Sequence, residues 1–201
     1  MNPITIYIEM TPNPNTMKFV ANKYLLESND SVEFQSSSEA KGYSPIAEAL
    51  FQFPFVKTVF ITANFVTIAK TDNVSWDFIA MELRDFIKDW LTEDKPVLTQ
   101  IPSPKAPQET SQDSTVSVRT TYAPSEFDQT IIDLLDEYVR PAVERDGGAI
   151  DFVGFEDGVV AVALKGSCSG CPSSTFTLKN GIENLLKQHL PAVKEVIAEA
   201  L

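Results

Sequence analysis

The chain has 201 residues, of which 43% are hydrophobic, and its 28 acidic and 16 basic side chains give a formal net charge of -12. A surface of that sign repels polyphosphate, so we expect neither nucleic acid nor anionic lipid among its ligands. No run approaches the roughly 20 apolar residues that a membrane-crossing helix needs. The first residues carry no basic or apolar leader pattern, so we expect a cytoplasmic protein.

The first 95 residues predict a small domain of mixed strands and helices. The expected elements, in chain order, are a strand over 4–10, a Pro/Asn turn over 11–15, a returning strand over 17–20, a helix from Pro45 behind the cap Ser44, two strands over 56–62 and 65–70 joined by a tight turn, and an amphipathic helix over 76–91. This part contains no Cys, no His and no Gly-rich phosphate loop. We therefore expect its many Phe side chains to form a core rather than a reactive site.

The segment 96–122 is rich in Pro, Ser, Thr and Gln and shows no sustained apolar period. Such a sequence cannot bury enough apolar surface to order itself, so it predicts a flexible linker. The linker divides the chain into an N-terminal domain over 1–95 and a C-terminal domain over 123–201, both of them acidic.

The C-terminal domain predicts the order helix, strand, strand, helix, strand, with a three-stranded sheet. The expected elements are a helix that begins behind Ser125 and ends at 146–148, two strands over 149–153 and 159–164 around an Asp-Gly turn, a helix through 176–190, and a last strand over 193–197. The fold class of the whole chain is thus α+β, with two small domains of the α/β-sandwich type joined by a flexible linker.

Cys168 and Cys171 form a C-x-x-C pair and are the two cysteines of the chain. The pair leaves a predicted strand and enters a predicted helix, where backbone N–H groups and the helix dipole favour thiolate over thiol. The small neighbours Ser167, Ser169 and Gly170 let the loop expose both sulfur atoms and offer N–H groups to inorganic sulfide. We therefore expect Cys168 and Cys171 to bind a metal or a cluster rather than to be inert core residues.

The number of available ligands favours a site that two chains share. Structural zinc sites and the common iron–sulfur clusters need about four protein ligands, whereas this chain offers two Cys and one His, His189. Because His189 lies near the far end of the predicted helix, we expect it at the surface, away from the cysteines. Two copies supply Cys168 and Cys171 twice, and a cluster held at the exposed edge between them suits a carrier that releases it.

Two other functions fit the same residues. Thioredoxin-like dithiol oxidoreductases also place C-x-x-C between a strand and a helix. Against that function, the strands and helices around the motif do not alternate as expected, and Pro172 follows the pair instead of lying within it. A binding adaptor that takes zinc between two copies remains open as a third function.

The two domains resemble those of the Nfu-type iron–sulfur cluster carriers. The residues that carry the resemblance to the NifU C-terminal domain are RPAVERDGG over 140–148, GSCSGCPSS over 166–174 and TLKNGIE over 177–183. Those that carry the resemblance to the Nfu N-terminal domain are TPNPNTMKF over 11–19, SPIA over 44–47 and VFI over 59–61. Two residues depart from the pattern, since Ala149 stands where we expect an acidic residue and Ser167 replaces the usual Ala.

The resemblance implies a carrier that is not an enzyme. Cys168 and Cys171 of two subunits would bridge a [4Fe-4S] cluster, one per homodimer, with a [2Fe-2S] cluster as the alternative. The cluster would come from an upstream assembly scaffold and pass by thiolate exchange to apo iron–sulfur client proteins. The N-terminal domain would recognise clients or assembly partners, and the linker would raise their effective concentration at the cluster.

Overall fold

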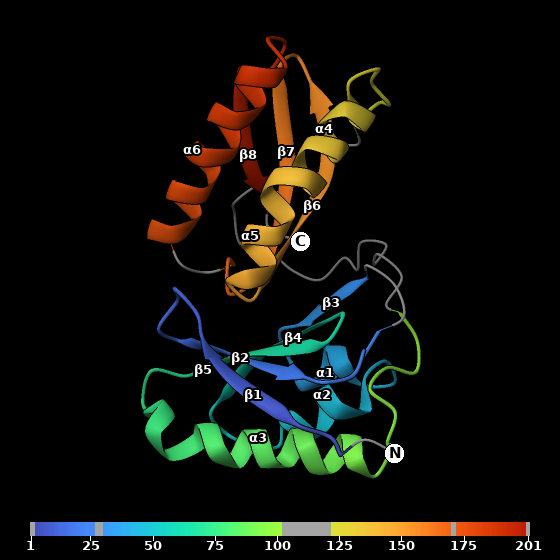
Figure 1. Ribbon diagram of the computed structural model, residues 1–201, viewed down its shortest axis with the longest axis vertical. Coiled ribbons are helices and arrows are strands. Elements are labelled where there is room, and N and C mark those ends of the chain that lie inside the picture. The colour runs from blue at the N-terminus through green and yellow to red at the C-terminus, as the bar shows by residue number, and fades with distance from the viewer. Residues whose placement is uncertain (1–2, 27–29, 102–121, 170–171, 200–201) are drawn as a thin grey trace, which may run out of the picture.

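The computed structural model describes residues 3–26, 30–101, 122–169 and 172–199, which form two α+β domains stacked on one another (Figure 1). Each domain has its own sheet, and the predicted fold class is confirmed. No helix in the described part of the chain combines the length and the apolar character needed to cross a bilayer.

The N-terminal domain is a five-stranded antiparallel sheet with helices packed on one face. Its elements are β1 (Ile6–Met10), β2 (Thr16–Ala21), β3 (Ser31–Phe34), α1 (Ser37–Ala40), α2 (Pro45–Leu50), β4 (Val56–Thr62), β5 (Phe65–Lys70) and α3 (Trp76–Thr92). The strand order is β1-β2-β5-β4-β3. The sequence patterns predict six of these elements but neither β3 nor α1, because each of the two has only 4 residues and shows no full period.

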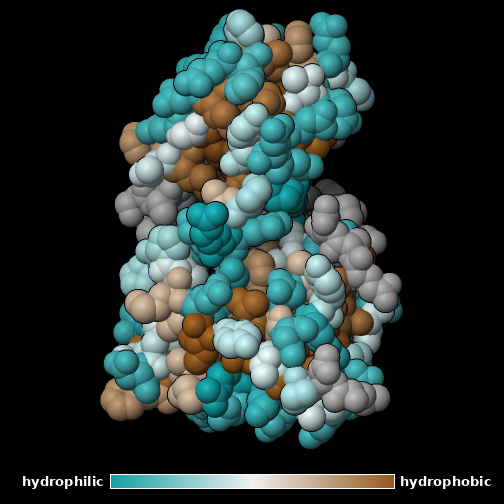
Figure 2. Space-filling model, viewed as in Figure 1, coloured by the Kyte–Doolittle hydropathy of each residue, from teal (hydrophilic) through white to brown (hydrophobic). Residues whose placement is uncertain are grey.

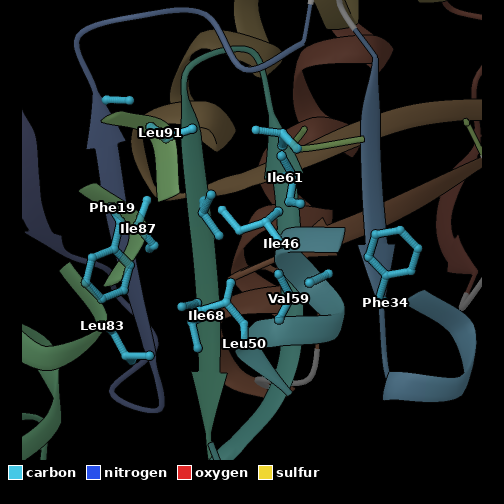
Figure 3. Packing of buried hydrophobic residues seen from close by; sticks show 14 of the residues in the cluster. Phe19, Phe34, Ile46, Leu50, Val59, Ile61, Ile68, Leu83, Ile87 and Leu91 are labelled. Atoms are coloured by element: carbon cyan, nitrogen blue, oxygen red, sulfur yellow. The ribbon is translucent and has the colours of Figure 1, made fainter. Parts of the chain in front are cut away.

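The central strands of this sheet are buried on both faces. Phe19, Ile61 and Ile68 face the helices, where they meet α2 and α3 (Figure 3). The neighbouring Phe60 and Phe65 point to the opposite face and are also buried, because the C-terminal domain covers that face. Near-continuous apolar strands are typical of this double burial.

The C-terminal domain follows the predicted order of elements. They are α4 (Asp128–Leu134), η1 (Leu135–Val139), α5 (Arg140–Arg145), β6 (Gly148–Glu156), β7 (Val159–Gly166), α6 (Pro172–His189) and β8 (Glu195–Glu199). β6 pairs with β7 as an antiparallel hairpin and β8 adds to β7 in parallel, so the sheet has the predicted three strands. The helices pack on one face of this sheet and enclose a separate apolar core.

The first helix of this domain contains a π-helical turn that the sequence pattern does not predict. In this turn the N–H of Arg140 bonds to the carbonyl of Leu135, five residues earlier. Pro141 follows directly, and its ring has no N–H and would crowd the carbonyl four residues earlier in a regular α-helix. The wider turn accommodates the proline without ending the helix.

The N-terminal domain continues past residue 95, the expected start of the linker. Val97 is buried in the core of that domain, and its carbonyl accepts a 2.7 Å hydrogen bond from Ser44 Oγ. The N–H of Thr99 bonds to the carbonyl of Tyr43 at 2.7 Å. The stretch up to Thr99 therefore packs on the domain instead of being flexible, because Val97 and Leu98 find apolar partners there. Residues 102–121 of the expected linker lie outside the described residues.

Replacing Ser44 by Ala should lower the free energy of unfolding by about 2 kcal/mol. The Ser44 hydroxyl accepts from the N–H of Ala47 and donates to the carbonyl of Val97, and the residue is fully buried. Ser36 caps α1 in the same way at a more exposed position, so Ser36→Ala should cost less than about 1 kcal/mol. Urea unfolding of both variants measures the difference, and equal losses would contradict a role for the buried bond to Val97.

Candidate functional site

Cys168 lies two residues beyond the end of β7, within a segment that we call the Cys168 segment (166–169). Its side chain is 8% exposed and belongs to the core of the C-terminal domain. Cys171, the second predicted ligand, lies outside the described residues. The structure therefore places one member of the predicted pair, at the junction between strand and helix that the sequence indicates.

Gly148 makes the space that Cys168 occupies. A Cβ atom at this position would lie 2.8 Å from Cys168 Sγ and 2.6 Å from the carbonyl oxygen of Lys165. Neither distance is compatible with a side chain, and the Lys165 oxygen belongs to the backbone of the paired strand. The second Gly of the Asp-Gly-Gly sequence thus has a direct role in the site, which residue type and spacing alone did not reveal.

Hydrogen bonds hold the Cys168 segment on several sides. Ser167 Oγ donates to the carbonyl of Asp146, and the Ser167 N–H bonds to the carbonyl of Gly147 at 3.2 Å. Ser169 Oγ lies 2.8 Å from the carbonyl of Gly166, and Thr175 Oγ1 of α6 donates to the carbonyl of Cys168 at 3.1 Å. These bonds, all made within the C-terminal domain, are one part of what holds the Cys168 segment in place.

The environment of Cys168 favours the thiol over the thiolate. Burial raises the pKa of the Cys168 thiol, and the negative charge of Asp146 adds to this, while the Ser167 hydroxyl acts in the opposite direction. The direction of this pKa shift is opposite to the one that a helix-stabilised thiolate would have. The physical reason is that Cys168 packs into the core of the C-terminal domain, where burial disfavours the charged form.

His189 takes no part in the site. It lies in the last turn of α6, where it is exposed and stacks on Tyr138 with 5.6 Å between the ring centroids. This confirms its expected position at the surface. Among the residues that the structure describes, no group of three or more His, Cys, Asp or Glu side chains could hold a metal ion.

A small pocket, open to solvent, adjoins Cys168 and has walls from both domains. Asp146, Ser167 and Cys168 line it from the C-terminal domain, and Pro12 and Asn13 line it from the turn between β1 and β2. The sequence predicts a turn at 11–15 but gives no sign that it reaches a cysteine more than 150 residues away. The N-terminal domain is therefore part of the surroundings of the site.

Both domains match described families. Residues 6–94 match the family described as scaffold protein Nfu/NifU N terminal, and residues 131–197 match the NifU-like domain. The chain therefore combines an Nfu-type N-terminal domain with a NifU-like domain, as the sequence resemblance predicted.

Curated relatives carry the same two regions. The NFU1 iron-sulfur cluster scaffold homolog, mitochondrial, of Drosophila ananassae is 37% identical over 191 residues, which cover 95% of this chain and 63% of that protein. Its counterpart from Drosophila erecta is 38% identical over the same length. The chain thus spans less than two thirds of these relatives. Among solved structures, the solution NMR structure of a NifU-like protein from Saccharomyces cerevisiae covers 50% of this chain and 89% of its own, with a TM-score of 0.45 and 25% identity.

Replacing Gly148 by Ala should displace Cys168 and lower the free energy of unfolding by about 1–3 kcal/mol, the usual cost of overpacking. Gly181 is a matched control in α6, since a Cβ there meets nothing within 4 Å. Gly181→Ala should instead stabilise the helix by roughly 0.5–1 kcal/mol. Urea unfolding of the two variants tests the difference in sign, and a neutral Gly148→Ala would contradict the close packing of Sγ on this glycine.

Proposed function

We propose that this chain carries an iron–sulfur cluster, which it binds through Cys168 and Cys171 of two copies and releases to apo-proteins. The observation that carries the proposal is the shortage of ligands around Cys168 in the described part of the chain. A site with about four protein ligands would need both cysteines from each of two copies. The match to the NifU-like domain and the description of the relatives as cluster scaffolds support this assignment.

The cluster is the cargo of such a protein. We propose a [4Fe-4S] cluster, one per homodimer, with [2Fe-2S] as the alternative type. Because only a thiolate binds iron, loading must remove the proton of Cys168 and overcome the burial that raises its pKa. The same burial favours the free thiol once the cluster has been released.

The environment of Cys168 weighs against a dithiol oxidoreductase. Such enzymes depend on a nucleophilic cysteine with a lowered pKa, whereas burial raises the pKa of Cys168. The Cys168 segment also follows an antiparallel hairpin, β6–β7, whereas alternating strands and helices are expected around the motif of such an enzyme. A dimeric adaptor that binds zinc would use the same two cysteines, so only the identity of the bound metal separates it from a cluster carrier.

The partners that we propose are apo iron–sulfur clients and an upstream assembly scaffold, and the proposed role is transfer without catalysis. The N-terminal domain (1–95) would contact clients or assembly partners, and the C-terminal domain (123–201) would hold the cluster. The cytoplasmic location stays a prediction. The names of the relatives place those proteins in mitochondria, and the chain spans 63% of their length.

Anaerobic reconstitution with iron and sulfide tests the proposed site. We expect the wild-type chain to bind about two iron and two sulfide ions per chain, the content of one [4Fe-4S] cluster per dimer. Cys168→Ser should abolish this binding because it removes half of the ligands. His189→Ala is the control, since His189 is exposed in the last turn of α6 and should leave the iron content unchanged. Full iron binding by Cys168→Ser would contradict the proposal.

A further inference from the structure

Glu33 of the N-terminal domain reaches across to the Cys168 segment. It lies on β3, an edge strand of the five-stranded sheet, and its Oε1 lies 3.1 Å from Ser169 Oγ. The single hydroxyl proton of Ser169 is shared between this carboxylate and the carbonyl of Gly166. The backbone N–H of Gly166 acts on the same carboxylate, since it opposes the rise in the pKa of Glu33 that burial causes. The charge of Lys165 lies nearby, and its Nζ is also 3.5 Å from Ser31 Oγ on β3. One carboxylate thus binds both ends of the segment that contains Cys168.

The β1–β2 turn and strand β5 contact the same region from the other side. Asn13 is nearly buried, and its Nδ2 donates to the carbonyl of Ser167 at 3.3 Å. Thr67 Oγ1 donates to the carbonyl of Gly147 at 2.7 Å. The N-terminal domain therefore hydrogen-bonds to the residues before and after Cys168, and also to the glycine that Ser167 itself bonds.

A small apolar contact completes the junction between the domains. Phe60 and Phe65 of the sheet pack against Ala149 of β6. Gly166 has a φ of +68°, and a Cβ at this position would lie 2.9 Å from Cδ1 of Phe60. The sheet thus fits closely over the start of β6 and the end of β7. The apolar area is small beside the two domain cores, and much of the contact is polar.

We propose that the N-terminal domain is a reversible latch on the Cys168 segment, with Glu33 as its main positioning residue. While the domains are docked, the segment is held at 166, 167 and 169, and Cys168 stays buried. Release of the latch frees the segment, so that Cys168 can approach the cysteines of a second copy. This last step rests on the proposed function, whereas the latch itself is a property of the chain without its cargo.

The balance of forces at the junction favours reversibility. Burial raises the pKa of the Glu33 carboxyl, and the bonds from Ser169 and Gly166 offset only part of this effect. A carboxylate that loses solvation on docking stabilises the docked state less than its hydrogen bonds suggest. Since both partners belong to one chain, docking has no concentration dependence and can be displaced by a competing partner.

The reactivity of Cys168 toward iodoacetamide, in the metal-free full-length chain, measures the latch. A Cys171→Ser background leaves Cys168 as the sole thiol. In this background Glu33→Ala should raise the alkylation rate about tenfold, which corresponds to about 1.4 kcal/mol of docking free energy. Glu82→Ala is the control, because Glu82 is exposed on α3, on the opposite face of the sheet, and should not change the rate.

A second variant separates a latch from a loss of folding. Ser169→Ala removes the same hydrogen bond from the C-terminal side, and it should also speed alkylation. The double variant should react no faster than the faster single variant, as residues of one contact are not additive. Thermal unfolding should stay cooperative in each variant. Wild-type rates in both Glu33→Ala and Ser169→Ala would overturn the latch.

The alkylation rates and the iron content after reconstitution together distinguish the latch from the proposed carrier function. If the chain binds no iron but Glu33→Ala still speeds alkylation, the latch stands and the carrier function fails. If iron binds normally and alkylation of Cys168 is insensitive to Glu33 and Ser169, the carrier function stands and the latch fails.

Discussion

The pairing of β6 with β7 is the interaction on which the site depends. It sets Gly148 opposite Gly166 and so brings the thiol of Cys168 against Gly148, which has no side chain to collide with it. The neighbouring Gly147 offers its carbonyl both to the N–H of Ser167 and to Thr67 Oγ1. The end of the hairpin where β6 begins and β7 ends therefore positions Cys168. It also forms hydrogen bonds to the Cys168 segment and to the N-terminal domain.

The N-terminal domain takes part in this arrangement because its sheet carries apolar side chains on both faces. One face of β4 and β5 carries residues such as Ile61 and Ile68 toward the helices, and the other carries Phe60 and Phe65 toward the C-terminal domain. On the face drawn in Figure 2, polar residues cover much of both domains, and apolar residues are visible in patches within each of them. The two cores remain separate, and the contact between the domains is small and rich in hydrogen bonds.

The sequence predicted the regular elements well because their signals are local. The period of two over 4–10, the cap at Ser44 and the apolar face over 76–91 depend on neighbours in the chain, and each gave the correct element. The short strand β3 carries no such signal, and Glu33 at its centre makes it look like loop. The contact between Glu33 and Ser169 joins residues 136 positions apart, which no local pattern can indicate.

The candidate cysteines could be picked out from the sequence, but the burial of Cys168 could not. Cys168 and Cys171 follow from spacing, yet the raised pKa of Cys168 depends on core packing against Gly148. The near-continuous apolar runs over 56–62 and 65–70 did contain a signal, since such runs are typical of strands covered on both faces. Read in that way, they indicate a partner layer on the second face but not which part of the chain supplies it.

The central claim is that two copies of the chain complete one site. Native mass spectrometry of the anaerobically reconstituted, full-length protein tests it directly, because the mass of the intact complex gives the number of chains and the composition of the bound cluster together. The account predicts a species of two chains with one cluster, and no cluster on a single chain. A cluster held by one chain, or a dimer that holds a zinc ion in place of a cluster, would contradict it.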